Sequence, residues 1–345
     1  MNRSLARQPS AARSRRRRRA LVVGAVTIVG LTCAGLWAVD EYGPRFNIYL
    51  APPSPQKYAD VAVGLLEQGY HADGPEWVSA REAVREAATH ATEYSDLYPT
   101  LSTAVAAAGG PHSSFLPPND ENAATAERAS APEPTVTTVD GVTTVTLPGL
   151  TSSSSAVQQR YADTASKGIA DAAPSTCGWV LDLRGNTGGN MYPMLSGVAA
   201  LLPNGPALTF RDRFGNTTTE VTIRAEGAGL NGHTITRIAQ TSKVTGPVAI
   251  LQDDRTASSG EVVLTAFRGL DRVETFGTPS AGYTSANTPY HLYDGAQLVV
   301  TESIYVDRDD TPLREEAIPA DHPTSADEAE SAAQDWLTNQ GCTTP

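Results

Sequence analysis

An apolar segment that runs into a serine-containing turn and then into a helical pattern constrains the fold more than any other feature of this chain. Residues 248–251 (VAIL) have the length and apolarity of a buried strand. The turn TASSG follows at residues 256–260, and residues 261–267 continue as an apolar helical pattern. Two roles are open to Ser258. It is either an N-cap that satisfies free helix N–H groups, or a nucleophile whose developing anion those groups stabilise.

Strand and helix patterns alternate along the second half of the chain. A hairpin is expected around Asp140 and Gly141, where β-branched runs flank the pair. Apolar strands at residues 178–183 and 246–252 each precede a helical pattern. This alternation predicts an α/β domain with a largely parallel core. Residues 224–243 are polar and glycine-rich, and we expect an irregular excursion there.

The N-terminal residues have a pattern typical of a membrane anchor. Eight arginines lie within residues 1–19, and residues 20–39 carry no charge over a length that matches a bilayer core. Acidic residues begin only at Asp40, which predicts a cytoplasmic N-terminus and an extracytoplasmic body in the cell membrane. The alternative is a cleaved signal peptide and a secreted body, although the apolar core of such peptides is usually shorter.

The body of the protein is acidic. The net charge is −12, and without the eight N-terminal arginines 18 basic residues face 38 acidic ones, a net charge of −20. Such a body lacks the basic footprint of nucleic-acid binding, so nucleic acid is not an expected partner.

Three cysteines are present, and Cys33 lies within the apolar N-terminal run. Cys177 and Cys342 both lie in the expected exported part, where an oxidising compartment would allow them to form a disulfide. Two unrelated thiols are the alternative, because sequence does not report distance.

These patterns divide the chain into six segments. They are a basic cytoplasmic arm (1–19), a transmembrane helix or uncleaved signal anchor (20–39), a proline-rich linker (40–56), a helical cap (57–110), an α/β core (111–323) and a C-terminal tail (324–345). In the cap, three apolar stripes separated by Gly and Pro predict three helices. The tail is polar apart from one helical pattern at residues 326–337.

A second strand-to-helix turn, LDLRGNTGGN at residues 181–190, carries three glycines. Glycine lets backbone N–H groups approach a ligand closely, and a plain tight turn is the alternative. The segment has neither the GxGxxG spacing of a dinucleotide site nor the lysine of a P-loop. The chain also lacks HExxH and any Cys/His cluster with ligand spacing, so no cofactor or metal is expected.

In this order along the chain, DLRGNTGGN and DDRTASSGE resemble the motifs of the C-terminal processing (tail-specific) serine peptidases. The resemblance covers about residues 109–321. It implies a crotonase-like (ClpP-like) α/β spiral with helical additions, here without a recognisable PDZ module. It also implies serine-type endopeptidase activity, with Ser258 as nucleophile and the N–H groups of Ser259 and of Gly188 or Gly189 as oxyanion donors.

A general base is still required, because a serine hydroxyl is a weak nucleophile at its free pKa. The lysine that many family members carry downstream of the nucleophile is missing, since every lysine here precedes Ser258 and Tyr283 stands near that position. His112, in the loop GGPHSSF, resembles the histidine base of the tricorn-core and interphotoreceptor-retinoid-binding-protein-like branch. Imidazole titrates near neutral pH, which suits a base, and a surface-loop histidine is the alternative.

In tricorn-like members a second serine and a late glutamate orient the histidine. Ser113 or Ser114 is the candidate serine, and Glu316 or Glu315, in LREEAIPADH, is the candidate glutamate. For the two glutamates, a solvated acidic pair is the alternative.

The sequence therefore predicts a membrane-anchored, extracytoplasmic serine peptidase in which Ser258 attacks the scissile carbonyl and His112 accepts its proton. A peptide or protein is the expected substrate, and a homo-oligomer is compatible with the sequence. The alternatives are a non-catalytic protein that binds a peptide or an apolar ligand on the same fold, and a small-ester hydrolase, because fold alone does not decide function.

Overall fold

The computed structural model describes residues 32, 34–39, 42–43, 48–118, 132–239 and 242–342. The expected basic arm, Cys33 and most of the expected transmembrane segment lie outside these residues, and residues 34–39 are helical. Within the described part of the chain, no helix is both long enough and apolar enough to cross a bilayer.

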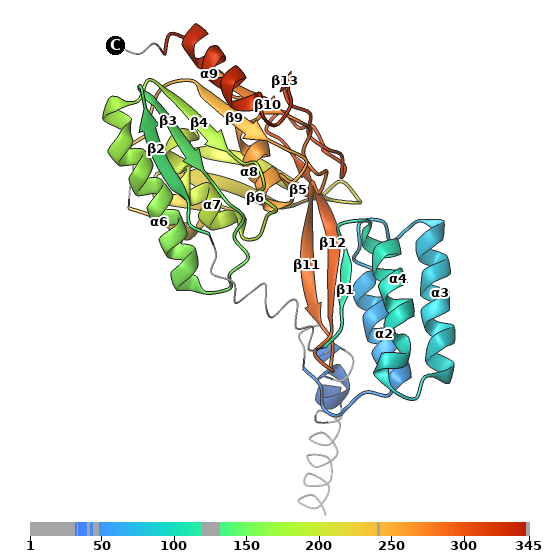
Figure 1. Cartoon of the computed structure of the whole chain (residues 1–345). Helices are drawn as coiled ribbons and strands as arrows, with labels where there is room; N and C mark the ends of the chain where they lie inside the picture. The colour runs from blue at the N-terminus through green and yellow to red at the C-terminus, as the bar shows by residue number, and fades with distance from the viewer. Residues whose placement is uncertain are drawn as a thin grey trace, which may run out of the picture.

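Three α-helices form a unit beside the rest of the molecule (Figure 1). They are α2 (Pro55–Leu66), α3 (Pro75–His90) and α4 (Tyr98–Gly109), with the 3-10 helix η2 (Tyr94–Leu97) between the last two. Each α-helix has proline in its first turn, where the missing N–H has no helical acceptor anyway. Their buried faces pack together around Trp77 and Leu101, and against Leu298 and Val300 of strand β12 (Gln297–Val306).

One sheet is the parallel core that the strand–helix alternation predicts. Its strand order is β13-β10-β9-β4-β3-β2, and every neighbouring pair is parallel except the β2–β3 hairpin. The strands are β2 (Thr135–Val139), β3 (Val142–Thr146), β4 (Gly178–Asp182), β9 (Val248–Gln252), β10 (Val273–Gly277) and β13 (His322–Pro323). Asp140 and Gly141 connect the hairpin with positive φ angles of 49° and 79°, as a two-residue turn between twisted strands requires.

A second sheet is antiparallel, and the strand–helix alternation does not predict it. Its order is β1-β12-β5-β6-β7-β8, and β11 also pairs with β12. The remaining strands are β1 (Ser114–Leu116), β5 (Gly205–Asp212), β6 (Thr217–Arg224), β7 (Gly227–Leu230), β8 (His233–Arg237) and β11 (Ser285–His291).

The irregular excursion expected over residues 224–243 is wrong, because β7 and β8 form there. Glycine weakens an isolated strand, but here it permits close pairing: a Cβ on Gly229 would lie 1.9 Å from the carbonyl oxygen of His233. Ala228 and Thr236 of these strands are buried. Tertiary packing thus overrides a weak local preference for strand.

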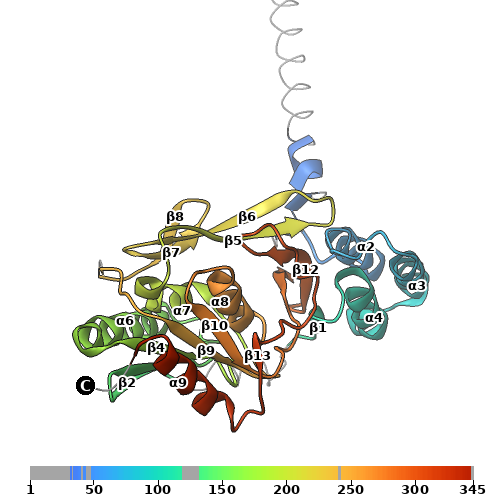
Figure 2. The same cartoon turned by 90° about the horizontal axis from the view of Figure 1, so that it is seen from above.

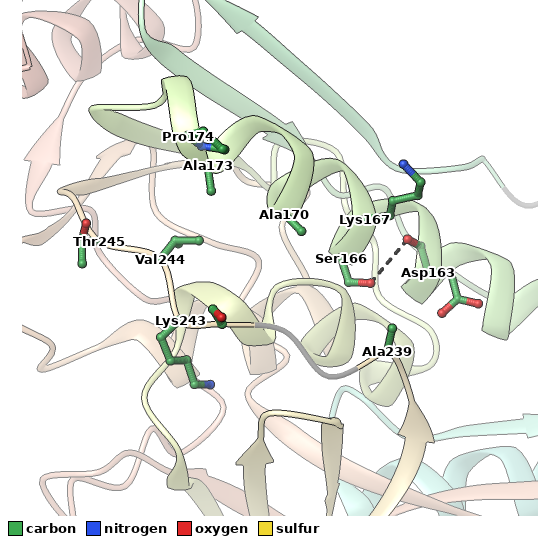
Figure 3. Close-up of a pocket in the computed structure, with 11 residues that line it drawn as sticks. Asp163, Ser166, Lys167, Ala170, Ala173, Pro174, Ala239, Lys243, Val244 and Thr245 are labelled. Carbon is green, nitrogen blue, oxygen red and sulfur yellow. Dashed lines mark hydrogen bonds between the residues drawn. The ribbon is translucent and has the colours of Figure 1, made fainter.

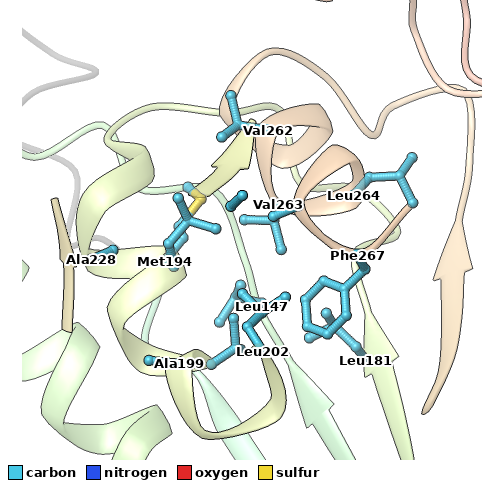
Figure 4. Close-up of a cluster of buried hydrophobic side chains, with 14 of the residues drawn as sticks. Leu147, Leu181, Met194, Ala199, Leu202, Ala228, Val262, Val263, Leu264 and Phe267 are labelled. Atoms are coloured by element: carbon cyan, nitrogen blue, oxygen red, sulfur yellow. The ribbon is translucent and has the colours of Figure 1, made fainter. Parts of the chain in front are cut away.

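Three helices lie between the two sheets, and a fourth covers the outer face of the parallel sheet (Figure 2). The inner helices are α6 (Ser155–Ala172), α7 (Met191–Gly197) and α8 (Ser259–Phe267), and the outer one is α9 (Ala329–Asn339). Every residue of α8 is buried, including the polar side chains of Ser259, Glu261 and Thr265. Its Val263 and Phe267 belong to the main apolar core together with Leu147 and Leu181 (Figure 4). The N-terminus of α8 is therefore held by a packed core.

The C-terminal residues belong to the same packed body. Ala333 and Leu337 of α9 are buried with Leu251 of β9. Beyond the helix, Cys342 forms a disulfide with Cys177, with the two Cα atoms 5.1 Å apart. Residues 324–342 are thus fastened to the amino end of β4 rather than extending as a free tail.

Candidate active site

Ser258 lies at the point where the buried strand β9 leads into α8, as the N-cap residue of that helix. Its backbone has φ 51° and ψ −115°, a region that non-glycine residues occupy only when the surroundings enforce it. Glu261 supplies part of that constraint, because its Oε2 accepts a hydrogen bond of 2.8 Å from the Ser258 N–H. Its Oε1 accepts from Ser280 Oγ at 2.6 Å and from the Gly282 N–H at 2.8 Å. Burial raises the pKa of the Glu261 carboxyl, although these donors oppose the shift.

The glycine turn after β4 packs directly against the serine turn. A Cβ on Gly188 would lie 2.8 Å from the Cβ of Ser258, so this contact requires glycine. Ser259 Oγ donates to the carbonyl of Gly189 at 2.5 Å, and Asn186 Oδ1 accepts from the Gly188 N–H at 3.0 Å. The Gly188 N–H is therefore engaged within its own turn. The N–H of Ser259, at the first position of α8, has no helical acceptor, and the Ser259 side chain contacts Gly189. The N–H groups of Ser259 and Gly189 are therefore the remaining candidate oxyanion donors.

His112 lies in the short connection between α4 and β1. Pairing of β1 with β12 fixes this connection at the edge of the antiparallel sheet, and the His112 carbonyl accepts from Asn287 Nδ2 at 2.9 Å. The imidazole ring lies 4.9 Å from the ring of Tyr283, centroid to centroid. Burial lowers the pKa of His112 below its ordinary value, while the charge of Glu315 opposes that shift. The ring therefore favours its neutral form.

A line of hydrogen bonds leads from His112 to a carboxylate. His112 Nδ1 lies 3.0 Å from Ser285 Oγ, and Ser285 Oγ donates to Glu315 Oε1, also at 3.0 Å. Ser285 is 1% exposed, so its hydroxyl is shielded from solvent. A serine hydroxyl has one proton, and when it points to the carboxylate, Nδ1 must be the donor to Ser285 Oγ. The neutral ring then carries no proton on Nε2.

Of the candidate partners for His112, Glu315 is joined to it, whereas Ser113 and Glu316 make other contacts. Ser113 Oγ accepts from the Thr301 N–H at 2.9 Å, and the exposed Glu316 contributes its backbone carbonyl to Thr284 Oγ1 at 3.4 Å. Ser285 and Glu315 are the serine and the glutamate that the structure joins to His112. Sequence reasoning missed Ser285 because it lies 173 residues from His112 and reaches it only through strand pairing. Its position two residues after Tyr283, near the family's lysine segment, is the one signal that could have indicated it.

Ser258 and His112 line the same two cavities, one of about 1100 Å³ and one of about 380 Å³. Ser259, Gly189 and Ser285 also line the larger one. Among the described residues no hydrogen bond joins the side chains of Ser258 and His112. The Ser258 side chain lies beside the buried phenol of Tyr305. Bonds between a nucleophile and its base are often absent before substrate binds.

The lysines lie elsewhere. Lys167 and Lys243 line a separate cavity of about 1030 Å³ between α6 and residues 242–245 (Figure 3). Lys243 Nζ donates to the carbonyl of Ala199 at 2.8 Å, and burial lowers the pKa of this amine. Lys57 lies in the first turn of α2 and lines yet another cavity. In the described structure no lysine lines either cavity that contains Ser258. A Ser–Lys pair is therefore excluded by the positions of the lysines as well as by their order along the chain, since all of them precede Ser258.

Comparison with known families gives the same assignment as the motifs. Residues 142–324 match the model of peptidase family S41. The match spans more than half of the chain and contains both turns together with Ser285 and Glu315. The chain belongs to peptidase family S41. The resemblance to the C-terminal processing peptidases is thereby confirmed at the level of the family.

Individual relatives of this S41 chain extend beyond the matched region. A nisin-resistance protein of Lactococcus lactis subsp. lactis is 32% identical over 324 residues, which cover 93% of this chain and 98% of the relative. A lipoprotein structure from Streptococcus agalactiae is similar with 30% identity and a TM-score of 0.74, over 85% of this chain and 99% of that one. The photosystem II D1 C-terminal processing protease has a similar fold, with 16% identity and a TM-score of 0.54 over 80% and 94% of the two chains.

Proposed function

We propose that this S41 member is a serine endopeptidase in which Ser258 is the nucleophile and His112 the general base. The observation that carries the proposal is the line of contacts from His112 through Ser285 to Glu315. It leaves the Nε2 of His112 without a proton, and an unprotonated imidazole nitrogen is what a serine nucleophile needs. The lowered pKa of the largely buried His112 ring supports the same role.

The proposed reaction begins when substrate enters the larger cavity and the Ser258 side chain turns from Tyr305 towards His112. The hydroxyl attacks the scissile carbonyl and its proton passes to His112 Nε2. The N–H groups of Ser259 and Gly189 stabilise the oxyanion. The charge of Glu315, transmitted through Ser285, stabilises the imidazolium. His112 then protonates the leaving amine, and water hydrolyses the acyl-enzyme by the reverse sequence of proton transfers.

The substrate that the comparisons favour is a peptide of the kind represented by nisin. The support is the nisin-resistance relative, which this chain matches over nearly its full length. Hydrolysis would be a direct route to such resistance for a member of a peptidase family.

We also propose that the protein is held at the membrane by residues 20–39, with a crotonase-like peptidase core outside the cytoplasm. The support is the N-terminal charge pattern and the Cys177–Cys342 disulfide, which suits an oxidising compartment. Protease protection of intact cells tests this placement. Digestion of the core only after cell lysis would overturn it.

The activity is tested with purified full-length protein, nisin and mass spectrometry of the products. We expect hydrolysis by the wild-type chain, and a loss on the order of 10⁴-fold or more in Ser258→Ala and His112→Ala. Ser259→Ala is the matched control for Ser258→Ala. It keeps the backbone N–H and loses only the bond from Oγ to the Gly189 carbonyl, so a smaller loss is expected.

The alternatives predict different results. A non-catalytic binding protein would bind nisin without forming products and would not react with a fluorophosphonate probe. If Ser258 is only a helix cap, Ser258→Ala would lower the free energy of unfolding by about 1 kcal/mol and leave turnover intact.

A further inference from the structure

The helical unit α2–α4 contributes a side chain to the proposed relay, by which we mean the line of contacts from His112 through Ser285 to Glu315. His71, between α2 and α3, lies 2.8 Å from Glu315, measured from Nε2 to Oε2. We propose that His71 is a positioning residue that holds the Glu315 carboxylate in the orientation that Ser285 and His112 require. This inference rests on the proposed function and goes beyond it, because it makes the helical unit a working part of the active site.

Each oxygen of the Glu315 carboxylate has a different partner. Oε1 accepts from Ser285 Oγ at 3.0 Å, and Oε2 contacts His71 Nε2. The Glu315 side chain is 7% exposed, whereas that of His71 is 46% exposed. Water therefore has little access to the carboxylate, and His71 is the partner of its Oε2.

The local backbone does not favour the orientation of Glu315 by itself. Arg314 and Glu315 both have positive φ, 48° and 58°. Such conformations are unfavourable for non-glycine residues and persist only when surrounding contacts enforce them. The contacts with Ser285 and His71 supply that enforcement at the side chain.

The backbone at His71 is bonded both to α4 and to the antiparallel sheet. Its N–H donates to the Ala108 carbonyl at 2.8 Å, and the N–H of the preceding residue, Tyr70, donates to Thr301 of β12 at 2.8 Å. A Cβ on Gly110 would lie 2.9 Å from His71 Nε2 and 3.0 Å from Glu315 Oε2. Glycine two residues before His112 therefore leaves room for the pair. The geometry joins α4, the His112 loop and the carboxylate into one contact region.

The inference is tested on full-length protein with His71→Phe, His71→Gln and the control His90→Phe. His71→Phe keeps a ring against Tyr70 and removes the ring nitrogens, and His90 is an exposed histidine at the end of α3. We expect His71→Phe to lower kcat on the order of 10- to 100-fold, as a small misplacement of a catalytic group does. KM should not change, because His71 lines neither cavity that contains Ser258.

His71→Gln should recover part of the lost kcat, because its amide N–H can reach the carboxylate. His90→Phe should retain the wild-type kcat. The melting temperature is measured for each variant, and a positioning role requires the loss of kcat in His71→Phe without a matching loss of stability.

The outcomes separate this inference from the proposed function. If Ser258→Ala is inactive while His71→Phe has the wild-type kcat, the role of His71 is wrong and the peptidase mechanism stands. The positioning role would also be contradicted if kcat and the melting temperature both fall, and fall equally in His71→Phe and His71→Gln. If Ser258→Ala remains active, the proposed function itself is wrong.

Discussion

Ser285 has one hydroxyl proton, and the direction in which it points determines the protonation of His112. Because the buried hydroxyl donates to Glu315, the imidazole donates from Nδ1 and keeps Nε2 as an acceptor. Burial then lowers the pKa of the ring and favours the neutral form, while Glu315 limits how far the pKa falls. One shielded hydroxyl thus connects a carboxylate to the proposed base without direct contact between them.

The pH dependence of activity follows from this arrangement. A base must be unprotonated, so kcat/KM should fall only as the pH drops through the lowered pKa of His112, below the ordinary value of 6.5. Glu315→Gln removes the charge that raises this pKa, so its acid limb should move to lower pH while kcat falls. Tyr283→Phe, which keeps a ring beside His112, should retain the wild-type profile and most of the activity. An acid limb at or above pH 6.5 in the wild-type protein would contradict the role of His112.

Two strand-to-helix turns surround the proposed nucleophile, and they contact each other through backbone and small side chains. The buried helix α8 anchors the turn that contains Ser258. Asn186 anchors the glycine turn, because it accepts from the Gly188 N–H and donates to the Leu147 carbonyl at 2.7 Å. The Ala257 N–H also donates to the Asn186 carbonyl at 2.9 Å. The position of Ser258 is therefore a property of two packed elements.

Comparison of Gly188→Ala with Gly185→Ala separates the effect of backbone strain from the effect of the close contact between Gly188 and Ser258. Both positions have positive φ, 99° and 70°, so both variants carry a penalty of about 1–2 kcal/mol. Only the Cβ at position 188 clashes with Ser258, since nothing lies within 4 Å of a Cβ at position 185. We expect kcat to fall about 10-fold or more in Gly188→Ala, through displacement of Ser258, and to change little in Gly185→Ala. Equal kcat values in the two variants would show that the contact does not position the nucleophile.

Across the whole molecule, the disulfide and the proposed nucleophile lie at opposite ends of the parallel sheet. Cys177 precedes β4, so its disulfide lies at the amino ends of the strands, whereas Ser258 follows the carboxyl end of β9. The helical unit, by contrast, lies beside β1, β11 and β12, next to the proposed relay (Figure 1). Loss of the disulfide should therefore affect folding more than turnover.

A Cys177→Ser/Cys342→Ser variant tests that separation. The disulfide closes a loop over a sequence separation of 165 residues, and in the loop-entropy model its loss costs at most about 5 kcal/mol. We expect thermal unfolding at a clearly lower temperature, with kcat at 25 °C close to that of the wild-type protein. A large fall in kcat at a temperature where circular dichroism shows a folded chain would mean that the tail also shapes the active site.

Local patterns in the sequence determined the helices of the cap, the parallel core, the turn that contains Ser258 and the glycine turn packed against it. These features depend on residues close together in the chain, where apolar periodicity, glycine and serine directly report strand, turn and helix. The same locality allowed the sequence to place His112 in a loop and to exclude a downstream lysine. Strands β7 and β8 were missed because their stability comes from pairing and burial rather than from local preference.

Only the tertiary structure decided which residues surround His112. Ser113 was a candidate because it adjoins His112, and Glu316 and Glu315 were candidates because their segment resembles one of the family, but strand pairing brings Ser285 to the ring and Glu315, not Glu316, contacts Ser285. His71 comes from a different unit altogether and reaches Glu315 across 244 residues of chain. Hydrogen bonds over such separations depend on how sheets and helices pack, and no local pattern in the sequence records that packing.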